Sequence, residues 1–101
     1  VRNDLGGTSL HTAAYWGQPK AVRALVAMRA DMAAKTDLSW APLHDAAARG
    51  HVAAIDALLI CRADIEAHTS IHDTPLHLAA QYGHAGAVHA LLTERANVGA
   101  R

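Results

Sequence analysis

The amino-acid sequence predicts an all-α solenoid in which helix–turn–helix units are stacked side by side. The chain repeats with a period of 33 residues, and 11 of the 33 aligned positions are identical in the three copies 3–35, 36–68 and 69–101. Each copy also contains two short segments in which apolar residues recur three or four positions apart, as on one face of a helix. A unit this short cannot bury its apolar face alone, so neighbouring units must stack.

The first helix of each copy has a recognisable start and end, which are clearest in the third copy. Thr74 offers a side-chain oxygen to the free amides of a first turn, and Pro75 then occupies the first helical position, where no amide hydrogen is needed. Gly83 ends this helix because glycine readily adopts the left-handed conformation. The stripe expected to be buried consists of Leu76, Ala79 and Ala80.

A second helix follows the glycine in each copy. Its apolar residues again recur at helical spacing, which predicts one buried stripe for each unit. These stripes are Val22, Leu25 and Val26, then Ile55, Leu58 and Leu59, then Val88, Leu91 and Leu92. We therefore expect two short antiparallel helices in each unit, and six in the chain.

The repeated segments resemble a known family. Thr74-Pro-Leu-His-Leu-Ala-Ala80, followed by Gly83-His84 and Leu91-Leu92, is similar to the ankyrin repeat, and degraded copies stand at Thr8–Ala14 and Ala41–Ala47. The resemblance covers residues 3–101. It implies one ankyrin-repeat domain over residues 1–101, with hairpin-like loops between the units and a function in binding other proteins.

Charge and composition exclude several other classes of protein. Nine basic and nine acidic residues give no net charge, which argues against a nucleic-acid surface or an electrostatic membrane anchor. No apolar run is long enough to span a bilayer, and Val1–Leu10 lacks the pattern of a secretory signal. Cys61 is the single cysteine, so an internal disulfide is impossible, and we expect a half-buried structural thiol. An intracellular protein, by default cytoplasmic, is the expectation.

Eight histidines are the residues that could suggest chemistry, but their pattern favours structural roles. Among them, His11, His44 and His77 stand 33 residues apart, where the family resemblance implies rings that hydrogen-bond the backbone of adjoining loops. His51 and His84 follow the turn glycines, where we expect a local structural role. No histidine pair has the spacing of a metal motif with cysteine partners, so we expect neither metal nor cofactor.

No sequence signature of catalysis is present either. The chain has no Gly-rich phosphate loop and no nucleophile elbow, and Cys61 lacks the signature of an activated nucleophile. Asp45, Asp56 and Asp64 belong to repeated positions, where we expect solvated or capping carboxylates. The chain is therefore predicted not to be an enzyme.

The junctions between units depart from the family pattern. Where the pattern has a glycine after the second helix, this chain has Arg29, Arg62 and Arg95, each of which would cost about 1 kcal/mol if left-handed. Asp31 and Asp64, with Asn97 in the third copy, are expected to hydrogen-bond their own turns. The loop glycine Gly6 is replaced by Ser39 and His72, and the capping threonine is replaced by Ala41.

The last unit keeps the apolar pattern of an internal one. Val88, Leu91, Leu92 and Val98 preserve that pattern, although terminal units usually carry polar residues there. Further repeats or a larger assembly covering this end are one interpretation, and a naturally frayed last repeat is the other.

The resemblance also implies where a partner would bind. In ankyrin-like stacks, the loop tips and the outward side of the first helices form a concave face whose residues differ between units. Trp40 is expected at a loop tip, with Ser70, Asp4, Leu5 and Gly7 at equivalent tips and with Ala48 and Arg101 on the same face. The predicted partner-binding residues are Tyr15, Trp16, Lys35, Asp37, Leu38, Trp40, Arg49, His68, Ile71, Asp73, Gln81 and Tyr82.

All four aromatic residues of the chain belong to this set, and aromatic residues and arginine are the usual anchors of interfaces. The predicted function is therefore a non-catalytic protein-interaction module or scaffold. Two alternatives stay open. Trp16 and Trp40 could simply pack against each other, and the chain could be a regulatory or docking segment of a larger enzyme or membrane complex.

Overall fold

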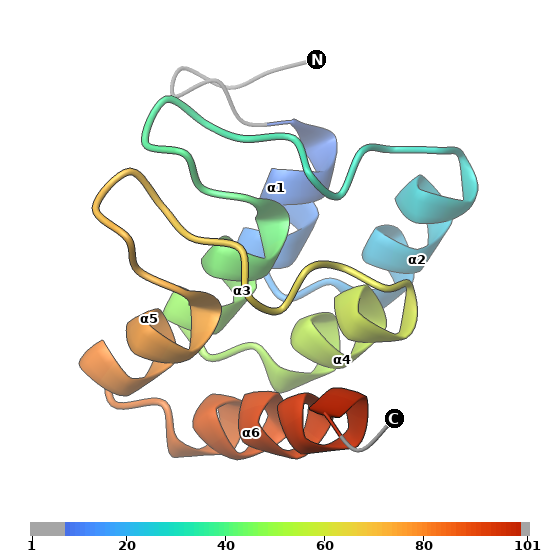
Figure 1. The fold of residues 1–101 in the computed structure, drawn as a ribbon. Coiled ribbons are helices and arrows are strands. Elements are labelled where there is room, and N and C mark those ends of the chain that lie inside the picture. Colours follow the sequence, from blue (N-terminus) through green and yellow to red (C-terminus); the bar gives the residue numbers. More distant parts are fainter. Residues whose placement is uncertain (1–7, 100–101) are drawn as a thin grey trace.

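The part of the chain that the structure describes contains the six predicted helices, and they form two layers. The computed structural model describes residues 8–99, and within them it contains helices and loops but no strand. The helices are α1 (Ser9–Tyr15), α2 (Pro19–Ala27), α3 (Pro42–Arg49), α4 (Val52–Ile60), α5 (Pro75–Gln81) and α6 (Ala85–Gly99). The first helices α1, α3 and α5 pack side by side, and so do the second helices α2, α4 and α6 (Figure 1). None of the described helices has the length and apolarity needed to cross a membrane.

Each first helix begins as the sequence predicts. Thr74 precedes α5 in an extended conformation, its hydroxyl accepts the amide of His77 at 3.2 Å, and Pro75 opens the helix. Ala41 lacks a hydroxyl, so the start of α3 relies on the ring of His44, whose Nδ1 accepts the amide of Ala41 at 2.9 Å. The histidine of the motif therefore caps the helix even where the threonine is missing.

The turn glycines have the left-handed backbone that their position requires. Gly17, Gly50 and Gly83 have φ values of 66°, 72° and 73°. A Cβ atom on Gly50 would lie 2.5 Å from the ring of His84, so the next unit also depends on this glycine having no side chain. The histidines that follow Gly50 and Gly83 therefore pack against the preceding unit: the His51 ring lies against Gly17, and the His84 ring against Gly50. His84 Nε2 also donates to the carbonyl oxygen of Ala48 at 3.0 Å.

Two of the three motif histidines, His11 and His44, are buried and bridge neighbouring units as predicted, whereas the prediction is wrong for His77, which is exposed and whose ring bonds to Thr74 of its own unit. In His44, Nδ1 accepts a backbone amide, so Nε2 carries the proton and donates to the carbonyl oxygen of Ala67 at 2.9 Å. His11 makes the equivalent bond to the carbonyl oxygen of Trp40 at 2.7 Å. Burial lowers the pKa of His44, with a smaller contribution from Lys35, and this keeps the ring neutral.

The core lies between the two helix layers and is deepest in the middle unit. Ile55, Leu58 and Leu59 are all buried, as is Leu43 of α3. Burial is less complete at the ends of the stack: Leu25 and Val26 are half-buried, and Leu92 is 48 % exposed. Ala80 is also exposed, so the predicted stripe of the third unit is only partly covered.

The left-handed arginine is found in two units and not in the third. Arg29 and Arg62 have φ values of 69° and 73°, and the carboxylates of Asp31 and Asp64 accept amides of their own turns at 2.8 and 2.9 Å. The expectation of a turn at Arg95 and Asn97 is wrong, because α6 continues through both to Gly99. Residues 95–99 therefore extend the helix in place of the left-handed turn found at Arg29 and Arg62.

The loops between units are hairpin-like turns with a left-handed residue. Thr36 N donates to Trp40 O at 2.9 Å, and Thr69 N donates to Asp73 O at 2.9 Å, closing two equivalent turns. Ser39 and His72, which replace the loop glycine, have φ values of 63° and 68°. Predictions for Asp4, Leu5, Gly6, Gly7 and Arg101, and for the side chain of Val98, fall outside the described residues.

Candidate functional site

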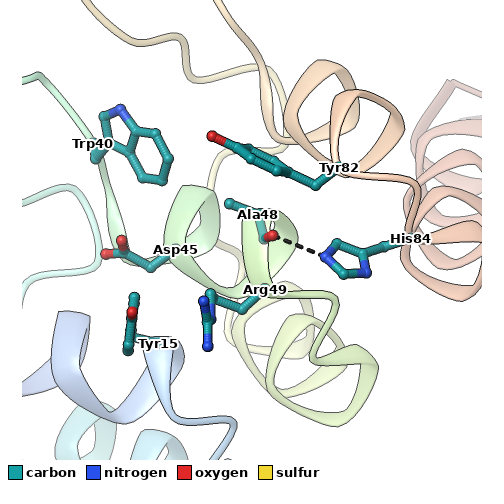
Figure 2. Close-up of a pocket in the computed structure, with 7 residues that line it drawn as sticks. All are labelled: Tyr15, Trp40, Asp45, Ala48, Arg49, Tyr82 and His84. Carbon is teal, nitrogen blue, oxygen red and sulfur yellow. Dashed lines mark hydrogen bonds between the residues drawn. The ribbon is translucent and has the colours of Figure 1, made fainter.

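A hollow lies where the first helices and loops of all three units meet, and it is centred on α3. Its volume is about 590 Å³. Seven residues line it: Tyr15 from α1, Trp40 from the loop before α3, Asp45, Ala48 and Arg49 from α3, Tyr82 at the end of α5, and His84 just before α6 (Figure 2).

A second hollow of about 520 Å³ adjoins the first, because both are lined by Tyr15, Trp40 and Asp45. It is completed by side chains of α1 and of the first loop, including Trp16 and Leu38. We call the two hollows together the aromatic groove, and define it by Tyr15, Trp16, Leu38, Trp40, Asp45, Arg49 and Tyr82.

The aromatic rings of the groove are largely accessible. Trp16 is 61 % exposed and Tyr82 is 55 % exposed, whereas Trp40 is half-buried. Trp16 lies edge-on to Tyr15, with ring centroids 5.0 Å apart, and Trp40 lies 6.2 Å from the ring of His44. Among the described ring contacts none joins Trp16 to Trp40, so mutual packing of the two indoles does not explain their position.

Arg49 lies over one of these rings. Its guanidinium carbon is 4.7 Å from the centroid of Tyr15, a cation–π distance. This contact joins α3 to α1 across the floor of the groove (Figure 2). The groove thus already contains one cation–π contact, between Arg49 and Tyr15.

Asp45 is the residue of the site that sequence reasoning missed. A solvated or capping carboxylate was expected there, but the side chain is half-buried, and this burial raises the pKa of the carboxyl group from 3.8 to about 7. A signal was present in the sequence, because the equivalent position of the third unit holds Leu78, an apolar residue typical of a covered position.

The structure brings together half of the predicted partner-binding residues. Tyr15, Trp16, Leu38, Trp40, Arg49 and Tyr82 line the groove. Trp40 closes the turn begun by Thr36, so its placement at a loop tip is wrong, and the left-handed Ser39 is nearer the tip.

The other six predicted residues do not line the groove. Lys35 and His68 border a separate hollow between successive loops, where Lys35 Nζ donates to the carbonyl oxygen of His68 at 3.4 Å. Asp37, Ile71 and Gln81 are exposed, and Asp73 is half-buried where its backbone closes a turn. Within the described residues, no group of three or more histidine, cysteine or acidic side chains is placed to hold a metal ion.

The comparison with protein families agrees with this architecture. A family model described as ankyrin repeats in three copies matches residues 10–101, which is most of the chain. The chain therefore belongs to the ankyrin repeat family. Ankyrin repeats are in general protein–protein interaction modules without catalysis of their own. A comparison with curated proteins finds no match.

Proposed function

We propose that this protein is a non-catalytic binding module that recognises another protein through the aromatic groove. The observation that carries the proposal is the clustering of aromatic side chains. The chain has only two tryptophans, two tyrosines and no phenylalanine, and all four rings line two adjoining hollows on one face. Rings that served packing alone would be buried in the core, whose large members here are leucine, isoleucine and valine.

Interface energetics support the same reading. Large aromatic side chains and arginine contribute most of the binding energy in protein complexes, particularly near the centre of a contact. Trp40 and Tyr15 line both hollows and so stand at the centre of the groove, with Trp16, Arg49 and Tyr82 around them. The exposed residues outside the groove, Asp37, Ile71 and Gln81, would lie at the rim of the contact, as would Lys35, His68 and Asp73.

The proposed setting is intracellular, with the cytoplasm as the default, and the chain would act there as a scaffold. The same groove would serve a regulatory or docking segment of a larger enzyme or membrane complex, with a neighbouring subunit as the partner. The identity of the captured protein distinguishes these two settings.

Site-specific photo-crosslinking in an extract of the source cells tests the proposal. A benzophenone amino acid replaces Tyr82 in the groove or, as a matched control, Ile60, which is 76 % exposed on α4. We expect the Tyr82 probe to capture a defined protein that the Ile60 probe does not capture. Excess unmodified chain should compete for this capture, whereas excess Trp16→Ala chain should compete poorly. Equal capture by the two probes would contradict the proposal.

A further inference from the structure

The aromatic groove contains a carboxylate that the protein does not neutralise. Asp45 lies between Trp40 and Tyr15, with its oxygens directed into the space between the two rings (Figure 2). The ion pair found among the described residues joins Arg95 to Glu66 on another face, and the described hydrogen bonds give the side chain of Asp45 no partner. A half-buried anion without a partner is costly unless something else supplies the opposite charge.

Arg49 is the nearest candidate to supply that charge, but it is engaged elsewhere. It stands four residues after Asp45 on α3, a spacing at which side chains can meet. Its guanidinium lies over the ring of Tyr15 instead, and the raised pKa of Asp45 has burial as its cause, with no opposing contribution from Arg49. The groove therefore offers an anion that is open to a ligand.

The surroundings of Asp45 define the chemistry of that ligand. The faces of Trp40, Tyr15 and Tyr82 carry partial negative charge and attract cations, while they also pack well against aliphatic carbon. An anionic group would be repelled by Asp45, and a neutral apolar group would bury the carboxylate further without compensation. A cation on an aliphatic stem satisfies both the rings and the carboxylate.

The charged side chains that line the groove support the same chemistry. Asp45 is the acid among the lining residues, and Arg49 is the strong base. The titratable groups that face Asp45 from the elements around it are Tyr15 and His11 of α1, Arg49 of α3, Tyr82 after α5 and His84 before α6. Arg49 is the one permanent cation among them.

We propose that Tyr15, Trp40, Asp45 and Tyr82 form a subsite for a lysine or arginine side chain of the partner protein. This inference rests on the proposed function of the groove and specifies what it selects. The aliphatic stem of the partner side chain lies between the rings, and its charged end pairs with the Asp45 carboxylate. A charge pair of this kind, shielded from water, contributes more than one at the rim.

Selection from a library of randomised twelve-residue peptides tests the proposal on the intact chain. Groove binders are the peptides whose binding is lost with Tyr82→Ala. We expect them to share a lysine or arginine, and we expect Asp45→Asn to weaken their binding by roughly thirtyfold. Asp56→Asn removes the same charge from an exposed position on α4 and should change binding less than twofold. Circular dichroism of each variant confirms that it is folded.

The outcomes separate this inference from the proposed function. Groove binders that share no basic residue would overturn the proposed subsite. Basic groove binders whose affinity does not change in Asp45→Asn would also overturn it. Both results would leave the proposed function standing. A library that yields no groove binder would overturn both.

A double-mutant cycle then tests for direct contact. The basic residue of a selected peptide is replaced by norleucine, which keeps the stem and removes the charge, and each peptide is measured against the wild type and Asp45→Asn. The factor by which norleucine weakens peptide binding should be at least fivefold smaller for Asp45→Asn than for the wild type. Independent, multiplicative losses would show that the two charges do not meet and would overturn the proposal.

Discussion

The second and third repeats share the same motif residues, yet the structure uses them differently. His44 and His77 occupy equivalent positions, but His44 is buried and bonds to the next loop, whereas His77 is exposed and caps only its own helix. Leu59 and Leu92 are likewise equivalent, and they are 8 % and 48 % exposed. The contribution of a repeated residue is thus decided by what packs beside its repeat, and matched substitutions can measure that dependence.

The histidine pair should show the largest difference. His44→Ala leaves the Ala41 amide and the Ala67 carbonyl without their partner and opens a cavity, so we expect a loss of about 4 kcal/mol in the free energy of unfolding. His77→Ala removes one exposed capping bond and should cost about 1 kcal/mol. Urea denaturation of both variants gives the two values. Equal losses would show that the covering unit adds nothing to the motif histidine.

The leucine pair tests the core in the same way. Leu59→Ala should lower the free energy of unfolding by about 3 kcal/mol, because the side chain is buried between α4 and its neighbours. Leu92→Ala should cost about 1 kcal/mol, since nearly half of its side chain is already in water. A cost at Leu92 as large as that at Leu59 would mean that another surface covers α6 in solution, and sedimentation analysis would detect such self-association.

The glycine pair isolates the contact between units from the backbone requirement. Gly50 and Gly83 both have positive φ, so alanine should cost about 1 kcal/mol at either position. A Cβ on Gly50 would also meet the His84 ring, whereas nothing lies within 4 Å of one on Gly83, so Gly50→Ala should cost about 2 kcal/mol in total. Thermal unfolding of the two variants compares them, and indistinguishable melting temperatures would rule out the contribution of the histidine ring.

Substitution of the two equivalent arginines by glycine should change the free energy of unfolding in opposite directions, and these are the smallest effects expected. Arg62 is left-handed, so Arg62→Gly should stabilise the protein by about 1 kcal/mol. Arg95 lies within α6, where glycine is a poor helix former, and Arg95→Gly should destabilise it by about 1 kcal/mol. Its exposed ion pair with Glu66, at 3.4 Å, adds little to that loss. A change of the same sign at both positions in thermal unfolding would contradict the two backbone assignments.

The sequence was sufficient to predict the parts of the fold that recur. The 33-residue period, the Thr-Pro start of α5 and the turn glycines predicted the six helices and their stacking, because those features act within one unit or between adjacent units. It did not predict the continuation of α6 through Arg95, since all three copies carry arginine there, and in two of them that arginine is left-handed and ends the helix.

The candidate site was predicted in part for the same reason. The four aromatic residues could be placed on one face by the family resemblance and their positions in the repeat. The sequence predicts a solvated or capping carboxylate at Asp45, because the pattern of one unit does not show which residues of the other units lie beside it. Tyr15 and Tyr82, which border its hollow, come from the first and third repeats. Lys35 and His68, by contrast, line a separate hollow between successive loops.

The central claim is that Asp45 is an uncompensated carboxylate held in the groove for a ligand, at a cost to stability. Its raised pKa means that ionisation is less favourable in the folded chain than in the unfolded chain. The free energy of unfolding is therefore not reduced by this group below pH 3.8. It decreases as the pH rises from 3.8 toward about 7, and it stays reduced above that value.

The stability of Asp45→Asn at two pH values tests this claim most directly, because asparagine has nearly the shape of the protonated acid. We predict that the variant exceeds the wild type in free energy of unfolding by about 2 kcal/mol at pH 8, allowing for water at the mouth of the groove. The advantage should largely disappear at pH 4, and Asp56→Asn serves as the control for a change in net charge. A variant less stable than the wild type at pH 8 would show that the carboxylate is paired within the fold, and would contradict the account.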